Sequence, residues 1–93
     1  PEGCCVEVPV TVTKDGYEVH PVGALPAQLA VIDNTAARSE ELAVRGCIEG
    51  DKRKIFHAIL VDPLTSAVLS MDEIQQMVDE MFEANKEYLP QFA

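Results

Sequence analysis

The sequence predicts an α+β fold, in which an N-terminal β-hairpin is followed by about three helices. Two observations support this prediction. Apolar residues alternate with other residues on both sides of an Asp-Gly pair early in the chain, and after Pro26 they recur every three or four residues. Alternation is typical of strands, and the longer period is typical of helices. The length of 93 residues suits one domain, so we expect residues 1–93 to belong to a single domain.

The first strand is predicted from valines separated by single residues: Val6, Val8, Val10 and Val12. We expect these valines to form the inner face of the strand. Pro9 has no N–H to donate, so either the strand lies at a sheet edge or the nitrogen of Pro9 faces outward.

The turn of the hairpin is predicted at Lys14-Asp15-Gly16, because an Asp-Gly pair supplies the positive φ angles of a tight turn. A second, shorter strand follows and ends at Pro21 or just past it. Its apolar residues are Tyr17, Val19 and Val22.

One long helix is predicted from about Pro26 to Glu49, since proline suits the first turn of a helix. Its apolar residues recur near helical spacing: Leu25, Leu29, Ile32, Ala36, Ala37, Leu42, Val44 and Ile48. The weak helix formers at positions 33–35 leave two alternatives open, an irregularity near Asn34 or a second N-cap. Gly50 suits the position just past the helix, where the left-handed conformation is common.

A second helix is predicted after Asp51, which can act as its N-cap. Its apolar face consists of Ile55, Phe56, Ile59 and Leu60. Asp62-Pro63 ends the helix, because a residue before proline is pushed out of the α region. We expect a short helical turn over residues 64–69, with three side chains packing inward: Leu64, Val68 and Leu69.

The last helix is predicted to begin at Ser70, which forms a capping box with Glu73. Asp72 and Glu73 also complement the positive end of the helix dipole. The apolar stripe of this helix is Ile74, Met77, Val78, Met81 and Phe82. The helical pattern fades before Leu89-Pro90.

The composition excludes several classes of partner. The net charge of −9 repels nucleic-acid phosphates and anionic lipid surfaces, so we expect neither nucleic-acid nor membrane partners. The basic run Lys52–Lys54 sits beside Glu49 and Asp51 and is interpreted as a solvated helix start. No apolar stretch approaches the ~20 residues that a membrane helix needs.

The cysteines indicate a reducing, cytoplasmic setting, because an odd number without regular spacing does not suggest a disulfide framework. They are Cys4, Cys5 and Cys47. The chain opens with Pro1-Glu2-Gly3 rather than methionine, and we interpret this start as a cut inside a longer polypeptide.

The sequence offers no clear reactive site, and no catalytic, cofactor-binding or metal-ligating residue is assigned. His20 and His57 do not form an HxxxH or CxxC-type ligand pattern, and no glycine-rich nucleotide loop occurs. The carboxylate pairs Glu40-Glu41 and Asp79-Glu80 are interpreted as solvated helix surface. The methionines suggest a soft peptide-binding groove or, more simply, core packing; they are Met71, Met77 and Met81.

An ordered series of segments runs through the chain: CVEVPV, DG, VGALPAQLA, NT, ELAV, GD, DPLTSAVLSMDEI and YLPQF. From Cys5 to Phe92, this series resembles the C-terminal part of glycoside hydrolase family 4. That family includes α-galactosidases, α-glucosidases, α-glucuronidases and 6-phospho-glycosidases. The most specific part is the order of LPAQLA, ELAV, GD and DPLTSAVLS.

The resemblance implies that the chain is a fragment of the substrate, or C-terminal, domain of an enzyme with a lactate/malate-dehydrogenase-like fold. It also implies an N-terminal Rossmann domain that binds NAD, and a divalent metal, commonly manganese, held by a cysteine and a histidine. Members cleave glycosides by transient oxidation at C3 and elimination, not with two carboxylates. The residues for these steps are expected upstream of Pro1, so the metal is not assigned to any cysteine or histidine of this chain, namely Cys4, Cys5, His20, Cys47 and His57.

One segment departs from the family pattern. Many members have a more polar segment similar to NRTNINVQE where this chain has residues 34–40. The matching residues are Asn34, Thr35 and Glu41, and the residues that differ are Ala36, Ala37 and Ser39. The subfamily and the sugar are therefore left open.

Two functions from different classes remain. The first is the structural C-terminal portion of an NAD- and divalent-metal-dependent glycoside hydrolase, inactive on its own. Its partners would be the remainder of the enzyme and, in a homo-oligomer, further copies. The alternative is a free-standing helical protein-interaction module that uses the Met-rich helix as a groove.

Overall fold

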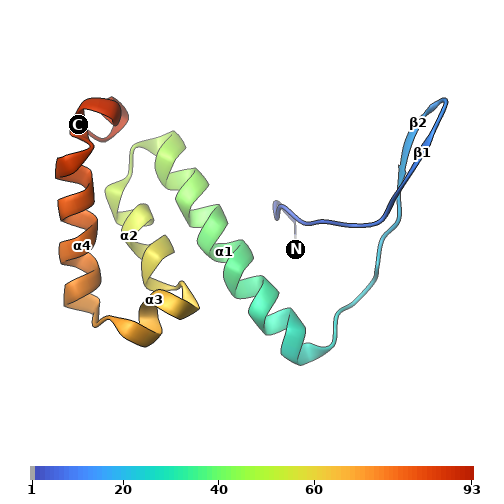
Figure 1. Ribbon diagram of the computed structural model, residues 1–93, viewed down its shortest axis with the longest axis horizontal. Coiled ribbons are helices and arrows are strands. Elements are labelled where there is room, and N and C mark those ends of the chain that lie inside the picture. The colour runs from blue at the N-terminus through green and yellow to red at the C-terminus, as the bar shows by residue number, and fades with distance from the viewer. Residues whose placement is uncertain (1) are drawn as a thin grey trace.

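A computed structural model describes residues 2–93, and these residues form the expected α+β arrangement (Figure 1). A hairpin of β1 (Val10–Thr13) and β2 (Gly16–Val19) leads into the long helix α1 (Ala27–Glu49). The helices α2 (Lys52–Leu60), α3 (Pro63–Val68) and α4 (Met71–Ala84) follow, and two 3₁₀ turns, Lys86–Tyr88 and Pro90–Phe92, end the chain. The short helical turn expected after Asp62 is α3, so the described residues have four α-helices rather than three.

The molecule is extended, because the hairpin projects away from the helices (Figure 1). The radius of gyration is 17.1 Å, although a compact domain of 93 residues would have a value of about 12 Å. The two strands are antiparallel, and Val10 pairs with Val19 while Val12 pairs with Tyr17.

The expectation that the valines of the first strand are buried is wrong for this chain. Regular pairing begins at Val10 rather than Val6, and the exposed fractions are 67% for Val6, 48% for Val10 and 82% for Val12. Alternation predicts that one face of a strand packs against other apolar groups, but it does not identify the part of the protein that supplies them. Within residues 2–93 no second layer lies over the hairpin (Figure 1).

The turn is built differently from the expected Asp-Gly geometry. The chain reverses at Lys14 and Asp15, and Gly16 adopts the positive φ angle of 131° at the start of β2. Among the described residues, only glycines have positive φ. Asp15 therefore keeps an ordinary backbone conformation, because a residue with a Cβ atom pays a steric cost in the left-handed region.

Helix α1 runs without interruption through the weak helix formers at positions 33–35. The Thr35 hydroxyl donates to the carbonyl oxygen of Val31 at 2.8 Å, so this polar side chain is satisfied within the helix and does not end it. The helix ends as expected at Gly50, whose φ of 67° is left-handed and whose N–H bonds to the carbonyl of Gly46.

The helices pack in the order α1, α2, α4, and α1 lies close to α2 at Gly46. A Cβ atom on Gly46 would lie 2.7 Å from the Cδ1 of Ile55, so only glycine fits without a shift of the neighbour. Nearer the middle of α1, the Ser39 hydroxyl donates to the carbonyl oxygen of Ala58 at 2.8 Å. The core is small, and its buried apolar residues are Ala58, Ile74, Val78 and Phe92.

Several side chains predicted to pack inward are exposed instead. In α3, Leu64 and Val68 are 75% and 71% exposed, and in α4 Met81 is 60% exposed. Part of the apolar side of α1 is also open to solvent: Leu29, Ile32, Val44 and Ile48. The periodicity correctly identified the apolar faces of the helices. Because α1, α2 and α4 pack side by side in one layer, each helix covers only part of its neighbour's apolar face.

The capping box of α4 is confirmed. The Glu73 carboxylate accepts from the Ser70 N–H at 2.8 Å, and the Ser70 hydroxyl oxygen accepts from the Glu73 N–H at 3.4 Å. Asp51 likewise caps α2, and Asp62 caps α3 by accepting from the Thr65 N–H at 2.8 Å.

Ser70→Ala should lower the free energy of unfolding by about 0.5–2 kcal/mol, because it removes the N-cap oxygen. Asp72→Ala should cost less, since an exposed charge near a helix N-terminus contributes about 0.3–1 kcal/mol. Urea denaturation followed by circular dichroism measures both. A neutral Ser70→Ala combined with a severe Asp72→Ala would mean that α4 does not depend on this cap.

Candidate functional site

The two histidines lie in different parts of the molecule, and neither belongs to a reactive cluster. His20 follows β2, is exposed, and its Nε2 lies 2.8 Å from the Thr11 hydroxyl. His57 lies on α2 and is half-buried, with its ring tilted against Phe56 at a centroid distance of 5.5 Å. These contacts place His20 on the hairpin surface and His57 against a neighbouring ring on α2.

The three cysteines are free thiols at separate places. Cys4 is half-buried and Cys5 is exposed, both before the hairpin, whereas Cys47 is exposed on α1. Within the described part of the chain, no three His, Cys, Asp or Glu side chains gather in a way that could hold a metal ion. The residues present here therefore do not fit the metal that the family resemblance implies.

Carboxylates of the two acidic pairs noted in the sequence accept hydrogen bonds from side chains of their own helix. Glu41 bonds to Arg38 and also accepts from Arg45 at 2.8 Å, and the hydrogen bond from Arg38 lowers the pKa of the Glu41 carboxyl. Asp79 and Glu80 accept from Gln75 and Gln76, one turn earlier on the same helix, at 3.1 Å and 2.8 Å. Asp79 and Glu80 are exposed on the helix surface, as expected, whereas the Glu41 side chain is only 27% exposed.

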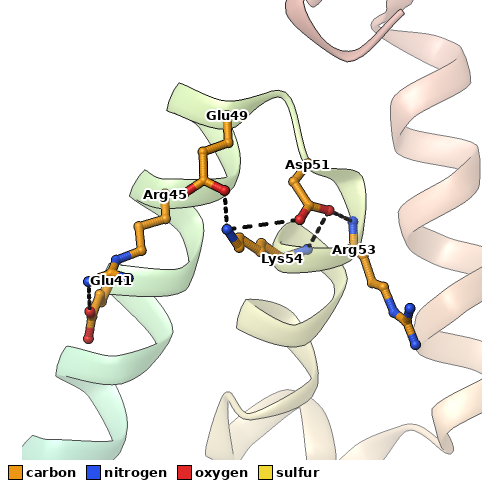
Figure 2. A network of polar contacts seen from close by, with 6 residues as sticks. All are labelled: Glu41, Arg45, Glu49, Asp51, Arg53 and Lys54. Carbon is orange, nitrogen blue, oxygen red and sulfur yellow. Dashed lines mark hydrogen bonds and ion pairs between the residues drawn. The ribbon is translucent and has the colours of Figure 1, made fainter.

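The basic run at the start of α2 serves the corner between α1 and α2. Figure 2 shows the Lys54 ammonium directed toward the carboxylates of Glu49 and Asp51, and both contacts are ion pairs. The Asp51 carboxylate also accepts from the Arg53 N–H at 2.9 Å. Lys54 is thus paired with neighbouring carboxylates, and the run forms the start of α2.

Acidification should destabilise the protein below about pH 4.5. Hydrogen bonds from Thr65 and Ser70 lower the pKa of the Asp62 and Glu73 carboxyls below their ordinary values of 3.8 and 4.5. A carboxyl whose folded pKa is lowered stabilises the fold above its unfolded pKa, and that contribution disappears as the pH falls through its folded pKa.

Unfolding measured by urea titration from pH 7 to pH 3 tests this dependence. Glu73→Gln is the matched control, because glutamine preserves the capping geometry but does not titrate. The variant should lose less stability on acidification than the parent protein. Equal losses, or a gain in stability at low pH, would contradict the assignment.

Two apolar hollows are the remaining candidates for binding. One of about 510 Å³ lies between α2 and α4, and its lining is Ile55, Ile59, Met77, Val78, Met81, Phe82, Asn85 and Leu89. Another of about 660 Å³ lies between the segment before the hairpin and the first half of α1, and includes Cys4, Val6, Leu25, Val31 and Asn34. The first is suited to packing against apolar groups, whereas the second also has polar side chains in its lining, namely Cys4, Asp33, Asn34 and Thr35. The first lies where the methionines suggested a groove, although core packing was the simpler interpretation of their spacing. The second joins segments too far apart in sequence for any local signal.

Among residues 2–93, no helix combines the length and the apolar character that crossing a membrane requires.

Comparison with known proteins identifies where this domain occurs. Residues 1–65 match the model of the family 4 glycosyl hydrolase C-terminal domain. An α-galactosidase of Bacillus subtilis (strain 168) is 33% identical over 87 residues, which is 91% of this chain and 20% of that protein. A probable 6-phospho-β-glucosidase of the same organism is 35% identical over 92 residues, which is 99% of this chain and 20% of that protein.

A third relative, an α-galactosidase of Rhizobium meliloti (strain 1021), is 32% identical over 93 residues, covering 100% of this chain and 19% of that protein. The chain thus spans about a fifth of the length of the curated relatives it matches. The family match covers well over half of the chain and includes the hairpin, α1, α2 and the start of α3. The chain therefore belongs to the family 4 glycosyl hydrolases, in which it corresponds to the C-terminal domain.

Proposed function

We propose that this chain is the C-terminal structural portion of an NAD- and divalent-metal-dependent glycosidase of the α-galactosidase/α-glucosidase type, and that it is inactive on its own. The observation that carries the proposal is the family match over residues 1–65 together with relatives about five times as long. The related proteins are named as α-galactosidases and phospho-glycosidases, which supports hydrolysis of a glycoside without selecting the sugar.

The exposed apolar surface supports a role in packing against the rest of the enzyme. Val12 and Tyr17 of the hairpin are 82% and 77% exposed, and Ile48 of α1 is 80% exposed. Apolar side chains gathered on one face of an element mark surfaces that associate with other protein. The remainder of the enzyme is accordingly the first partner that we propose for this domain.

The cofactors are proposed for the whole enzyme and not for this portion. By resemblance, the enzyme uses NAD and Mn²⁺, which together supply the oxidation and the acidity of the neighbouring carbon that elimination requires. The described residues have no cluster of His, Cys, Asp and Glu that could hold the metal, and the sequence has no glycine-rich nucleotide loop, so we expect the residues that bind both groups to lie upstream. The contribution of this chain is to complete the fold that positions the residues upstream. Three free thiols support a reducing compartment such as the cytoplasm.

An activity assay on the purified 93-residue chain tests the proposal. With NAD and Mn²⁺ present, p-nitrophenyl glycosides with and without a 6-phosphate should not be hydrolysed, whereas the full-length polypeptide should hydrolyse at least one of them. Reproducible turnover by the isolated chain that is abolished by Cys47→Ala or His57→Ala would overturn the proposal.

A free-standing interaction module is the second candidate, and the apolar groove between α2 and α4 favours it. Met77 and Met81 line that groove, and methionine adapts well to varied apolar ligands. The two candidates differ in what precedes residue 1. A dinucleotide-binding strand–turn–helix upstream supports the glycosidase, and a start codon directly before Pro1 supports the module.

The isolated chain should self-associate, most simply as a two-fold dimer, through the hairpin more than through α4. Val12→Lys places a charge on the apolar face of the hairpin and should weaken the dimer, while Met81→Lys is the matched change on α4. Light scattering over a dilution series measures both. A monomer at every concentration would contradict the prediction, and a loss confined to Met81→Lys would move the contact to the helix.

A further inference from the structure

The hairpin has two edges, and the hydrogen-bond pattern tells which residues face each of them. The His20 N–H donates to the Pro9 carbonyl oxygen at 2.9 Å, which makes Pro9 and His20 a hydrogen-bonded pair just beyond the strands. Such pairs alternate with non-hydrogen-bonded pairs in an antiparallel ladder. Val10 with Val19, and Val12 with Tyr17, are therefore the non-hydrogen-bonded pairs, so their N–H and C=O groups point outward.

The two edges differ in their capacity to accept another strand. On the β1 side the outward-facing positions of the ladder are Val10 and Val12, and each carries an N–H; the next position by alternation is Val8, which also has one. Pro9 does not interrupt this edge, because its carbonyl points inward to His20. On the β2 side the outward positions are Tyr17 and Val19, and the next one is Pro21, which has no N–H to donate.

The β1 edge also lacks the usual protection. Natural edge strands are commonly guarded by outward prolines, charged side chains or bulges. From Val6 to Thr13 the only charged residue is Glu7, and it precedes the paired region. The β1 edge is therefore an open template for pairing, whereas Pro21 limits the β2 edge.

One face of the hairpin carries apolar side chains that are exposed to solvent. The side chains of both non-hydrogen-bonded pairs lie on one face, where Val10 and Val19 are each 48% exposed. The opposite face carries Thr11, Glu18 and His20, of which Thr11 and His20 are bonded to each other. A two-stranded hairpin alone is marginally stable in water, and a third strand with an apolar layer is the common remedy.

We propose that the polypeptide preceding this domain adds a strand antiparallel to β1, which converts the hairpin into a three-stranded meander. This inference rests on the proposed function, because it requires the longer enzyme. The domain is C-terminal in its family and matches about 20% of each relative, so the remaining chain enters at the β1 side. Strands that follow each other in sequence usually lie side by side, and a short connection makes them antiparallel.

Amide hydrogen exchange in the full-length enzyme tests the inference. The Val10 and Val12 amides should exchange at least about tenfold more slowly than the Tyr17 and Val19 amides, since one net hydrogen bond is worth about a factor of ten. In the 93-residue chain at high dilution, all four amides should exchange at similar rates. Equal exchange at both edges of the full-length enzyme, or protection at the β2 edge alone, would overturn the inference.

A pair of matched proline variants provides a second readout. Val12→Pro and Val19→Pro are the same substitution, and each removes one outward N–H without removing a hairpin hydrogen bond. In the full-length enzyme, Val12→Pro should lower the melting temperature more than Val19→Pro does. Equal shifts would count against a strand on β1.

The outcomes separate this inference from the proposed function. An enzyme that hydrolyses glycosides but leaves the β1 amides unprotected keeps the proposed function and refutes the added strand. Protection of the β1 amides in the full-length enzyme that disappears on dilution would identify a second copy as the occupant instead. That result would also refute the inference.

Discussion

Gly50→Ala should lower the free energy of unfolding by more than about 2 kcal/mol, for two separate reasons. Gly50 has a φ of 67°, and the left-handed region costs a residue with a Cβ atom about 1–2 kcal/mol. The new Cβ would also lie 2.1 Å from the carbonyl oxygen of Gln91, which is a backbone atom and cannot rotate away. The substitution would push the C-terminal turn, with Phe92, off the end of α1.

The variant Gly50→Asn distinguishes the cost of the left-handed backbone conformation from the cost of the clash with Gln91. Asparagine tolerates the left-handed conformation better than alanine, but its Cβ meets the same carbonyl of Gln91. Chemical denaturation should therefore find Gly50→Asn almost as unstable as Gly50→Ala. A near-neutral Gly50→Ala would mean that the C-terminal turn does not pack where the structure places it.

Ile74→Ala should be comparably severe, with a loss of about 2–5 kcal/mol in the free energy of unfolding. Ile74 is 1% exposed and is the largest fully buried side chain among the described residues. Few other residues are buried, so little surrounding structure can relax to fill the cavity. Because the core is small, the stability of the four helices depends more on this one side chain than the stability of a protein with a larger core would.

Met81→Ala is the matched control, because Met81 lies two turns later on the same helix and is 60% exposed. A substitution at such a site is usually within about 0.5 kcal/mol of neutral. Denaturation curves for both variants provide the test. Similar losses from Ile74→Ala and Met81→Ala would indicate that α4 packs through a different face.

The order of elements could be predicted because each boundary has a local chemical cause. The capping box of Ser70 and Glu73 indicates the start of α4. Asp62 before Pro63 ends α2, and Gly50 ends α1. A cap or a proline restricts the backbone through atoms only a few residues away, so these signals hold in almost any surroundings.

Burial could not be predicted equally well, because it depends on what lies opposite. Val78 and Met81 belong to the same apolar stripe, but Val78 is 2% exposed and Met81 is 60% exposed. Periodicity identifies the stripe without telling how far the neighbouring helix reaches. In the hairpin, Val12 follows the pattern of a buried strand while 82% of its surface is exposed.

In the candidate site, too, local features could be predicted from the sequence, and contacts between distant segments could not. Local spacing predicted that Asp79 and Glu80 lie on the helix surface, and both are exposed. The prediction that His20 and His57 bind no metal stays a prediction. Local spacing could not bring together the segment before the hairpin and the first half of α1, which form a hollow only in three dimensions. The family could be identified because a long ordered series of short segments is more specific than any one of them.

The coding sequence upstream of residue 1 tests the central claim most directly. If the chain is the C-terminal portion of an NAD-dependent family 4 glycosidase, the reading frame should continue upstream for several hundred residues. It should contain a glycine-rich strand–turn–helix of the dinucleotide-binding type. A start codon immediately before Pro1, in frame and without such a motif upstream, would contradict the claim and favour the free-standing interaction module.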